Sequence, residues 1–236
     1  MNKIISLGLF ITFLNFTSTV QAQTNSFSGW LVFTHIQKIS NKVNVTLDAQ
    51  LRSKDNLIGI KNVLIRPGMN YVFNKTWSSG IGYTYIDTQT DQSPPLKAHL
   101  SENMVWEQLV TSYQISSFHL ISRARLEQRF IEKQSNDIFS QRLRLFTKLF
   151  IPLSKTKDLN KGIYLAIQNE FLFNVQNKED LNQHFFDQDR AFIGLGHQFN
   201  KYFGLEGGYL LNAIKGKTEN LNKHIIQLTV LTKLGK

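Results

Sequence analysis

Basic and acidic side chains recur at every second position along two stretches of the chain, and they are the residues best suited to do chemistry. Arg123, Arg125, Glu127 and Arg129 alternate with other residues, and the same spacing returns from Arg142 to Arg144. The guanidinium group of arginine is planar, binds both oxygens of a carboxylate at once and is less strongly hydrated than an ammonium group. Such rows predict either a structural Arg–Glu ladder or a basic track that guides an anionic solute.

All eight arginines lie in segments that alternate between apolar and polar residues, whereas most lysines lie between these segments. A charged side chain facing lipid at mid-bilayer costs roughly 2–4 kcal/mol, so we expect the polar face to point into a barrel. The candidate residues of this lumen network are Arg52, Arg66, Arg123, Arg125, Glu127, Arg129, Arg142, Arg144, Glu170, Arg190 and Glu206. We also expect Glu127 to accept hydrogen bonds from Arg142 or Arg144, because they lie on neighbouring strands.

Enzymatic chemistry is not indicated by the remaining residues. The chain has no cysteine, which excludes disulfides, thiolate metal sites and cysteine nucleophiles. His119 and Ser122 are three residues apart on a predicted strand and would point to opposite faces, and the six histidines show no metal-ligand spacing. No helix follows Gly194 and Gly196, so this pair is not a phosphate loop and is expected to relieve crowding or allow curvature. We therefore expect no catalytic residue, no metal and no cofactor.

The elements that must position the network are β-strands, because period-two alternation dominates from Phe27 onward. Between Val43 and Arg52 apolar and polar residues alternate without a break. Several segments reach the roughly 9–11 residues that a tilted strand needs to cross a membrane. Eleven strands are predicted, at residues 27–37, 42–53, 60–73, 77–87, 99–113, 117–131, 138–153, 162–173, 188–199, 202–213 and 223–234.

The connections between these segments alternate between short and long, which is typical of an outer-membrane barrel with tight periplasmic turns. The fold class expected is all-β: an antiparallel, up-and-down transmembrane β-barrel of about 10–12 strands with an Arg/Glu-rich interior. Bacterial barrels have even strand numbers. Segment 27–37 is therefore expected to be an extra N-terminal piece of a ten-stranded barrel, unless a twelfth strand exists. Arg66-Pro67-Gly68 is expected to form a bulge, since proline cannot donate to the ladder.

Aromatic residues near the predicted strand ends are expected to form girdles at the two membrane interfaces. They are Trp30, Trp77, Tyr83, Tyr85, Tyr113, Phe130, Phe199, Tyr202 and Tyr209.

The first 22 residues have the three regions of a secretory signal peptide. Lys3 is followed by an apolar stretch from Ile4 to Phe16, and Val20-Gln21-Ala22 offers small residues for cleavage after Ala22. Residues 23–236 are then expected to form a single barrel domain in the bacterial outer membrane. No apolar run of 18 residues occurs, which excludes a polytopic helical membrane protein.

The formal net charge is +10, which raises the question of an anionic partner. The predicted export of the chain and the predicted inward direction of its arginine side chains argue against a nucleic-acid partner. Lysines in the connections are instead expected to meet outer-membrane lipid and the anionic lipopolysaccharide surface, and a small anionic solute is a further possible partner.

Short motifs follow one another along nearly the whole exported chain. They are Leu47–Arg52, Val63–Tyr71, Gly82–Tyr85, Glu102–Leu109, Arg123–Phe130, Asn169–Phe171, Asp187–Arg190 and Gly194–Gly196. In order and spacing they resemble domain-of-unknown-function family 2490, a family of bacterial outer-membrane proteins. Met104 stands where that pattern leads us to expect a basic residue, and the chain ends on Lys236 without the terminal aromatic of the usual barrel signal. The resemblance implies a fold and a compartment, and it brings no activity or active site.

The function expected is that of an outer-membrane barrel with a structural, non-enzymatic role, in which the network fills the lumen. One alternative is a narrow channel selective for anions or acidic saccharides. A second alternative is a soluble, lipocalin-like periplasmic barrel whose apolar face encloses a ligand. The side of the wall that carries the polar residues distinguishes the soluble barrel from the two membrane alternatives, because a soluble barrel would expose Arg123, Arg125 and Arg142 on its outer wall.

Overall fold

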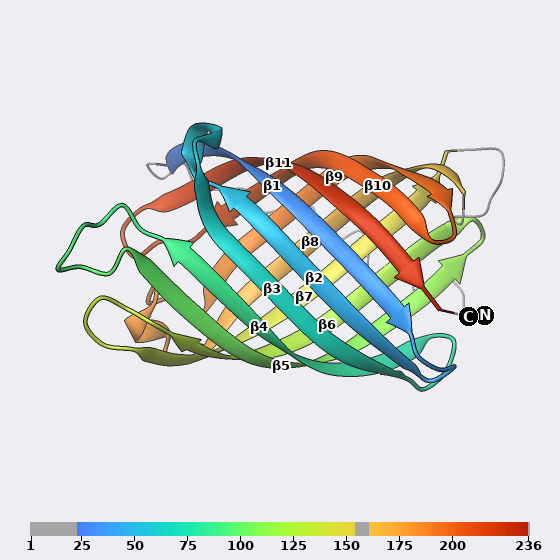
Figure 1. The fold of residues 1–236 in the computed structure, drawn as a ribbon, viewed down its shortest axis with the longest axis horizontal. Helices are drawn as coiled ribbons and strands as arrows, with labels where there is room; N and C mark the ends of the chain where they lie inside the picture. Colours follow the sequence, from blue (N-terminus) through green and yellow to red (C-terminus); the bar gives the residue numbers. More distant parts are fainter. Residues whose placement is uncertain (1–22, 154–160, 236) are drawn as a thin grey trace, which may run out of the picture.

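The computed structural model describes residues 23–153 and 161–235, which form a single closed β-barrel (Figure 1). The strands are β1 (Gln23–Lys38), β2 (Val43–Ser53), β3 (Ile60–Val72), β4 (Trp77–Gln89), β5 (His99–Ile115), β6 (Phe118–Ile131), β7 (Ile138–Pro152), β8 (Gly162–Gln176), β9 (Phe186–Asn200), β10 (Phe203–Ile214) and β11 (Asn220–Leu234). The 3₁₀ turns η1 (Asp55–Leu57) and η2 (Lys178–Asp180) are the only helical elements of the described residues, and neither has the length to cross a membrane. The predicted all-β barrel and its eleven strands are confirmed. The predicted signal peptide, residues 1–22, lies outside the described residues.

The barrel is closed by a parallel pair between its first and last strands. Every other pair joins neighbours along the chain and is antiparallel, whereas β1 runs parallel to β11 from Gln23 opposite Asn220 to Gln37 opposite Leu234. In an odd number of sequential antiparallel strands the first and last point the same way, so they can only pair in parallel. The expectation of an even strand number is therefore wrong: segment 27–37 is a full strand of the wall, and closure needs no twelfth strand.

The two ends of the barrel differ in their connections (Figure 1). One end, here called the turn end, carries the short connections 39–42, 73–76, 116–117 and 201–202 and the end of β11. The opposite end, the loop end, carries the longer connections 54–59, 90–98, 132–137, 177–185 and 215–219 and the start of β1. The predicted alternation of short and long connections is confirmed, while most of the link predicted at residues 154–161 lies outside the described residues.

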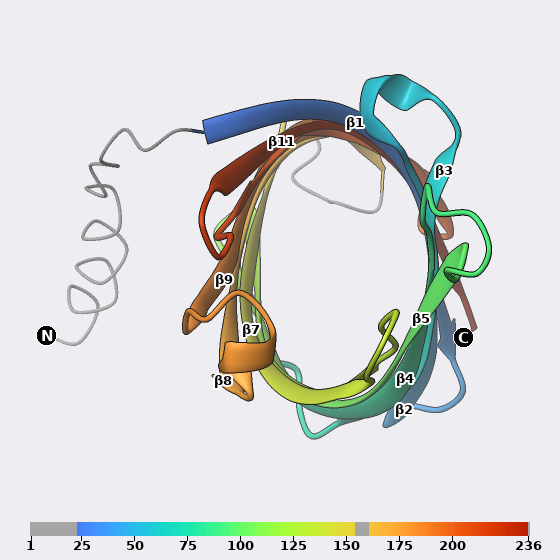
Figure 2. The same ribbon diagram turned by 90° about the vertical axis from the view of Figure 1, so that its left-hand side faces the viewer.

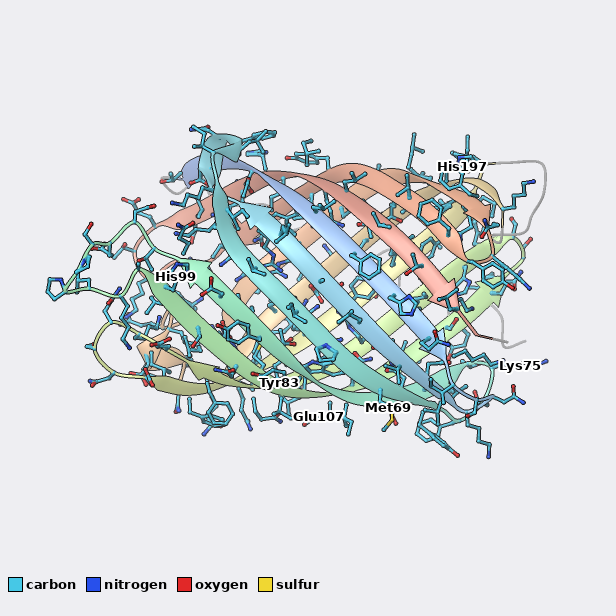
Figure 3. The ribbon with its side chains drawn as sticks, viewed as in Figure 1. Met69, Lys75, Tyr83, His99, Glu107 and His197 are labelled. Carbon is cyan, nitrogen blue, oxygen red and sulfur yellow. The ribbon has the colours of Figure 1, made fainter. Side chains whose placement is uncertain are left out.

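Alternation along each strand separates an inner from an outer face. In the β6–β7 ladder Glu127 lies opposite Arg142 and Leu126 opposite Leu143, so charged and apolar pairs take opposite sides of the wall. Figure 2 looks into the ring of strands, and Figure 3 shows Met69 and Glu107 on the outside of the wall. The outer wall is mainly apolar, with exposed side chains that include Leu31, Phe33, Val45, Ile65, Met69, Ile81, Val105, Leu109, Leu145, Ile167, Ile193, Leu195, Ile226 and Leu228.

Glycines on the inner face make room for large rings in the lumen. A Cβ atom on Gly68 or Gly82 would collide with the indole ring of Trp106, and a Cβ atom on Gly196 would collide with the ring of Tyr164. Gly196 therefore relieves crowding, as predicted from the sequence. These glycines allow the lumen to hold side chains that are bulky for a barrel of this size.

Pro67 interrupts the pairing of β3 with β4 without changing the register of the two strands. The β3–β4 pairing is recorded up to Ile65 and resumes at Gly68 in the same register, and the β2–β3 register is also unchanged at Pro67. The predicted bulge at Arg66-Pro67-Gly68 is therefore wrong. The register shift between β2 and β3 lies between Arg52 and Ser53 instead.

Candidate functional site

Glu127 in β6 is fully buried in the lumen and is bound by two arginines of β7. Arg142 donates from Nε and Nη2 to its Oε2 atom, at 2.9 and 2.7 Å, and Arg144 donates from Nη1 to its Oε1 atom at 2.8 Å. Charge-assisted hydrogen bonds of this length are roughly twice as strong as those between neutral groups. The prediction that Glu127 accepts hydrogen bonds from Arg142 or Arg144 is confirmed, with both arginines taking part.

Arg144 extends this cluster to Glu170 in β8. Its Nε and Nη2 atoms donate to the two carboxylate oxygens of Glu170 at 3.1 and 2.7 Å, a bidentate pair. Glu170 also accepts a hydrogen bond from Nη2 of Arg123 at 2.7 Å and lies 3.6 Å from Nη1 of Arg190. One continuous ion-pair cluster therefore joins β6, β7, β8 and β9 on the inner face.

A second cluster surrounds Trp106 in β5. Its indole nitrogen donates to the hydroxyl of Thr84, which also accepts a hydrogen bond from Nε of Arg66 at 3.2 Å. The guanidinium of Arg66 pairs with Asp48 at 3.2 Å, and that of Arg125 lies 4.0 Å from the Trp106 ring centroid. The cluster links β2, β3, β4 and β5 to Arg125 in β6, and Nη1 of Arg125 lies 4.0 Å from Oε1 of Glu127 in the first cluster.

Met104 occupies the inner position where a basic residue was expected. It is 1% exposed, and its sulfur lies 4.0 Å from Nη2 of Arg142. On the same side of the lumen Arg129 pairs with Glu102 at 2.5 Å. A thioether therefore packs against Arg142 at a point where another cation would be repelled.

Arg52 is the least neutralised arginine of the lumen. Among the described residues no carboxylate lies within 4.0 Å of Arg52, whose Nη2 atom donates to Gln50 at 2.6 Å. Its guanidinium lies 4.0 Å from the ring centroid of Trp30, and that of Arg190 lies 5.6 Å from the same ring. Trp30 therefore faces the lumen, and its predicted place in an interfacial girdle is wrong. The other predicted girdle residues are exposed: Trp77, Tyr83, Tyr85, Tyr113, Phe130, Phe199, Tyr202 and Tyr209.

One ion pair joins two strands that are not neighbours in the wall. Lys148 in β7 donates from Nζ to Oε1 of Glu206 in β10 at 2.6 Å, although β8 and β9 lie between them. Beside it lies an apolar cluster of Tyr164, Ala166, Phe192, Leu210 and Ile225, with Trp30 and Phe150 packed against it. Charged and apolar side chains together line this part of the barrel interior.

All eleven candidate residues lie on the inner face, and so does Asp48, which the alternation in the sequence places on the same face and which binds Arg66. The structure adds Glu102 and Asp187, which bind arginines, and Lys148, which binds Glu206. Lys148 continues the spacing of Arg142 and Arg144, which was the available signal for it. Nothing in the sequence marks Trp30 and Trp106 as the rings on which arginines stack.

The histidine and serine considered from the sequence, His119 and Ser122, are not brought together. His119 is hydrogen-bonded through Nε2 to the hydroxyl of Ser112 at 2.8 Å, and Ser122 lies within 3.4 Å of Thr147 on the outer wall. His119 and Ser122 thus face opposite sides, as expected. The described residues contain no group of histidine, aspartate and glutamate side chains that could hold a metal ion.

At the loop end Glu132 ties two connections to the rim of the barrel. Its Oε1 atom accepts a hydrogen bond from Nζ of Lys97 at 2.8 Å, and its Oε2 atom accepts from the backbone and hydroxyl groups of Ser101 at 2.9 and 2.8 Å. The hydrogen bonds from Lys97 and Ser101 lower the pKa of Glu132 to about 2. This carboxylate therefore holds the 90–98 and 132–137 connections together.

The Glu132 contacts are expected to respond to acid. Because the pKa of Glu132 is below its ordinary value, the contacts are complete above about pH 4.5 and are lost as the pH falls toward 2. We expect the protection factor of the Ser101 amide, measured by hydrogen exchange, to fall over this range. In Glu132→Gln it should be low throughout, whereas Glu179→Gln, in another loop, should behave as the unaltered chain does. A Ser101 protection factor that is constant from pH 5 to pH 2 would contradict the assignment.

Comparison with known families gave one match. A sequence model described as "Protein of unknown function (DUF2490)" matches residues 27–223, from within β1 to within β11. No curated protein and no solved structure matches the chain.

Proposed function

The chain belongs to the DUF2490 family, whose function is unknown, and from this premise we propose that it is an outer-membrane β-barrel with a closed lumen. Its proposed role in the bacterial envelope is structural rather than enzymatic. The observation that carries the proposal is an ion-paired, filled interior behind an apolar outer wall.

The outer wall supports placement in a membrane. Soluble monomers rarely expose contiguous apolar patches larger than a few hundred Å², yet here exposed leucine, isoleucine, valine and phenylalanine side chains recur on strands all around the barrel. Glu107 and Gln128 are polar exceptions, and Gln128 donates to the Glu107 carboxylate at 3.0 Å. A lipid environment accounts for a wall of this composition.

The interior supports a closed lumen. Arg142, Arg144 and Glu127 are less than 9% exposed, and their bonds run along the inner face from β6 to β8. The Lys148–Glu206 pair joins two strands that are not neighbours in the wall, and Trp106 is 1% exposed. Side chains that are this deeply buried and bonded to one another leave little room for a continuous water path.

The soluble, lipocalin-like alternative is disfavoured by the direction of the arginines. Such a barrel would place Arg125 and Arg142 on its outer wall, whereas they are 4% and 7% exposed and lie inside. Its ligand cavity would be lined by the apolar face, and that face is the outer one here. The polarity of the wall therefore favours the membrane proposal.

The connections at the two ends of the barrel indicate how it is oriented in the membrane and what it contacts. In outer-membrane barrels the short turns face the periplasm and the longer loops face outward, so the turn end is assigned to the periplasm. The loop end carries lysines such as Lys61, Lys178 and Lys217, which suit an anionic lipopolysaccharide surface. Outer-membrane lipid and lipopolysaccharide are the proposed partners.

Fractionation and electrical recording test this proposal together. The exported chain is expected in the outer-membrane fraction, with heat-modifiable migration on gels. Reconstituted in a planar bilayer, it is expected to give no steady conductance, because the buried network blocks the lumen. A porin reconstituted in the same way serves as the positive control.

The anion channel is the second candidate, and the incomplete neutralisation of Arg52 is the observation that favours it. A steady anion-selective current that falls in Arg125→Ala and Arg144→Ala would replace the closed barrel by a channel. Recovery of the chain as a soluble periplasmic protein would overturn the membrane placement itself.

A further inference from the structure

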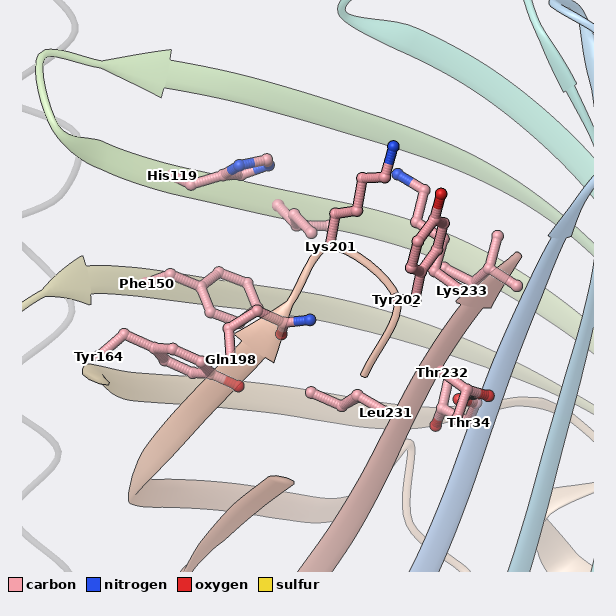
Figure 4. Close-up of a pocket in the computed structure, with 12 residues that line it drawn as sticks. Thr34, His119, Phe150, Tyr164, Gln198, Lys201, Tyr202, Leu231, Thr232 and Lys233 are labelled. Atoms are coloured by element: carbon pink, nitrogen blue, oxygen red, sulfur yellow. Dashed lines mark hydrogen bonds between the residues drawn. The ribbon is translucent and has the colours of Figure 1, made fainter. Parts of the chain in front are cut away.

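A cavity of about 280 Å³ lies in the turn-end half of the barrel interior (Figure 4). Its walls come from strands on several sides of the barrel, including Ile121 of β6, Phe150 of β7, Tyr164 of β8 and Leu231 of β11. Lys201, in the turn between β9 and β10, and Lys233, near the end of β11, complete it. In Figure 4 these lysines lie across from Phe150 and Tyr164.

The cavity combines an apolar wall with positive charge at its mouth, where Lys201 and Lys233 are exposed. No aspartate or glutamate lines it. Within the described part of the chain, neither Lys201 nor Lys233 has a carboxylate within 4.0 Å; Lys201 lies only over the ring of Tyr202, at 4.8 Å. The nearby carboxylate of Glu206 is already bound by Lys148 at 2.6 Å.

Tyr164 is 3% exposed and contributes its ring to the apolar wall. Its hydroxyl lies beside the Glu206 carboxylate, which is its hydrogen-bonding partner, so the polar end of this side chain is already occupied.

We propose that this cavity binds a small organic anion that carries one carboxylate on a compact apolar body. Lys201 and Lys233 would hold the carboxylate, and Phe150, Tyr164 and Leu231 would pack against the body. Ligand sites are typically concave and mainly apolar, with a few polar groups that fix orientation, and their volumes begin at about 300 Å³, so the ligand must be small. The inference goes beyond the structural role proposed above and does not depend on a membrane, because the cavity lies inside the barrel in either setting.

Calorimetric titration with benzoate tests the proposal on the exported chain folded in a non-ionic detergent. We expect saturable one-to-one binding that is weakened about tenfold or more in the double variant Lys201→Gln/Lys233→Gln, because a charge-assisted hydrogen bond contributes at least that factor. The matched control is Lys42→Gln/Lys75→Gln, which removes two exposed lysines of the turn end that do not line the cavity. It should bind benzoate as the unaltered chain does.

Two further ligands separate the contribution of charge to binding from that of apolar contact, and neither requires a substitution in the chain. Benzyl alcohol keeps the ring and lacks the charge, and acetate keeps the charge and lacks the ring, so both should bind more weakly than benzoate. Benzoate binding that survives in the Lys201→Gln/Lys233→Gln variant, equal binding of benzyl alcohol, or the absence of saturable binding would each overturn the proposal.

Discussion

Replacing Glu127 with alanine is expected to lower the free energy of unfolding of the barrel by about 3–5 kcal/mol, because breaking a buried ion pair from one side leaves uncompensated charge. Glu127 is fully buried, and both of its oxygens accept hydrogen bonds from arginine. Arg144 would retain Glu170, whereas Arg142 would retain only Asp187, at 3.7 Å. Urea unfolding of the folded chain, followed by tryptophan fluorescence, measures the change.

Glu107 provides the matched control for this substitution. It lies on the neighbouring strand β5, but its side chain is exposed on the outer wall, and among the described residues its carboxylate accepts hydrogen bonds from Gln128 alone. Glu107→Ala should not lower the free energy of unfolding, because a charged side chain on a lipid-facing wall destabilises a barrel rather than stabilising it. Equal stability of the Glu127→Ala and Glu107→Ala variants would contradict the role assigned to the buried network.

The alternation of apolar and polar residues along the sequence was enough to predict the strands and the side of the wall on which each candidate residue lies. Successive side chains of a strand point to opposite sides, so the positions of Arg123, Arg125 and Glu127 in sequence decide which side they share. Because β7 follows β6 directly along the chain, it was expected to be its neighbour in the wall, and this predicted the contact of Glu127 with Arg142 and Arg144. These predictions needed only the period of the strand and the order of the strands.

Closure of the barrel was not predictable in the same way. The parallel pairing of β1 with β11 joins residues about 200 positions apart in sequence and leaves no local trace. The even-number rule came from other barrels rather than from these residues, and it misassigned segment 27–37. The direction of Trp30 was missed because its place near a predicted strand end outweighed the period of β1, which turns its ring toward Arg52.

Contacts between strands that are not neighbours in the wall were also beyond the sequence, because they depend on the cross-section of the closed barrel. Lys148 and Glu206 each lie on an inner face, but only the size and shape of the lumen decide that they meet, since their strands, β7 and β10, are not neighbours. The same holds for Arg142, which reaches Met104 past β6. Sequence periodicity thus predicts which residues enter the lumen and does not predict which of them meet.

The Lys148–Glu206 pair offers a test of how such a contact between non-neighbouring strands contributes to stability. Glu206 is 1% exposed, and the Lys148 ammonium group lies between it and the rings of Phe150 and Phe192, at 5.0 and 5.6 Å from their centroids. Lys148→Met keeps the length of the side chain and leaves the Glu206 carboxylate unpaired, while Glu206→Leu leaves the ammonium unpaired. Each single substitution is expected to lower the free energy of unfolding by about 3–5 kcal/mol.

The double variant Lys148→Met/Glu206→Leu should be about as stable as the unaltered chain, because hydrophobic residues of similar volume often replace a buried ion pair without loss of stability. The control is the Lys54–Asp91 pair, which has the same 2.6 Å separation but is exposed at the loop end. Lys54→Met and Asp91→Leu should show no measurable coupling, since water screens exposed charges. Urea unfolding of the four variants of each pair gives the two coupling energies. If the losses of Lys148→Met and Glu206→Leu simply add in the double variant, the pair does not act as a unit, and the account of a lumen held closed by buried charges fails at this contact.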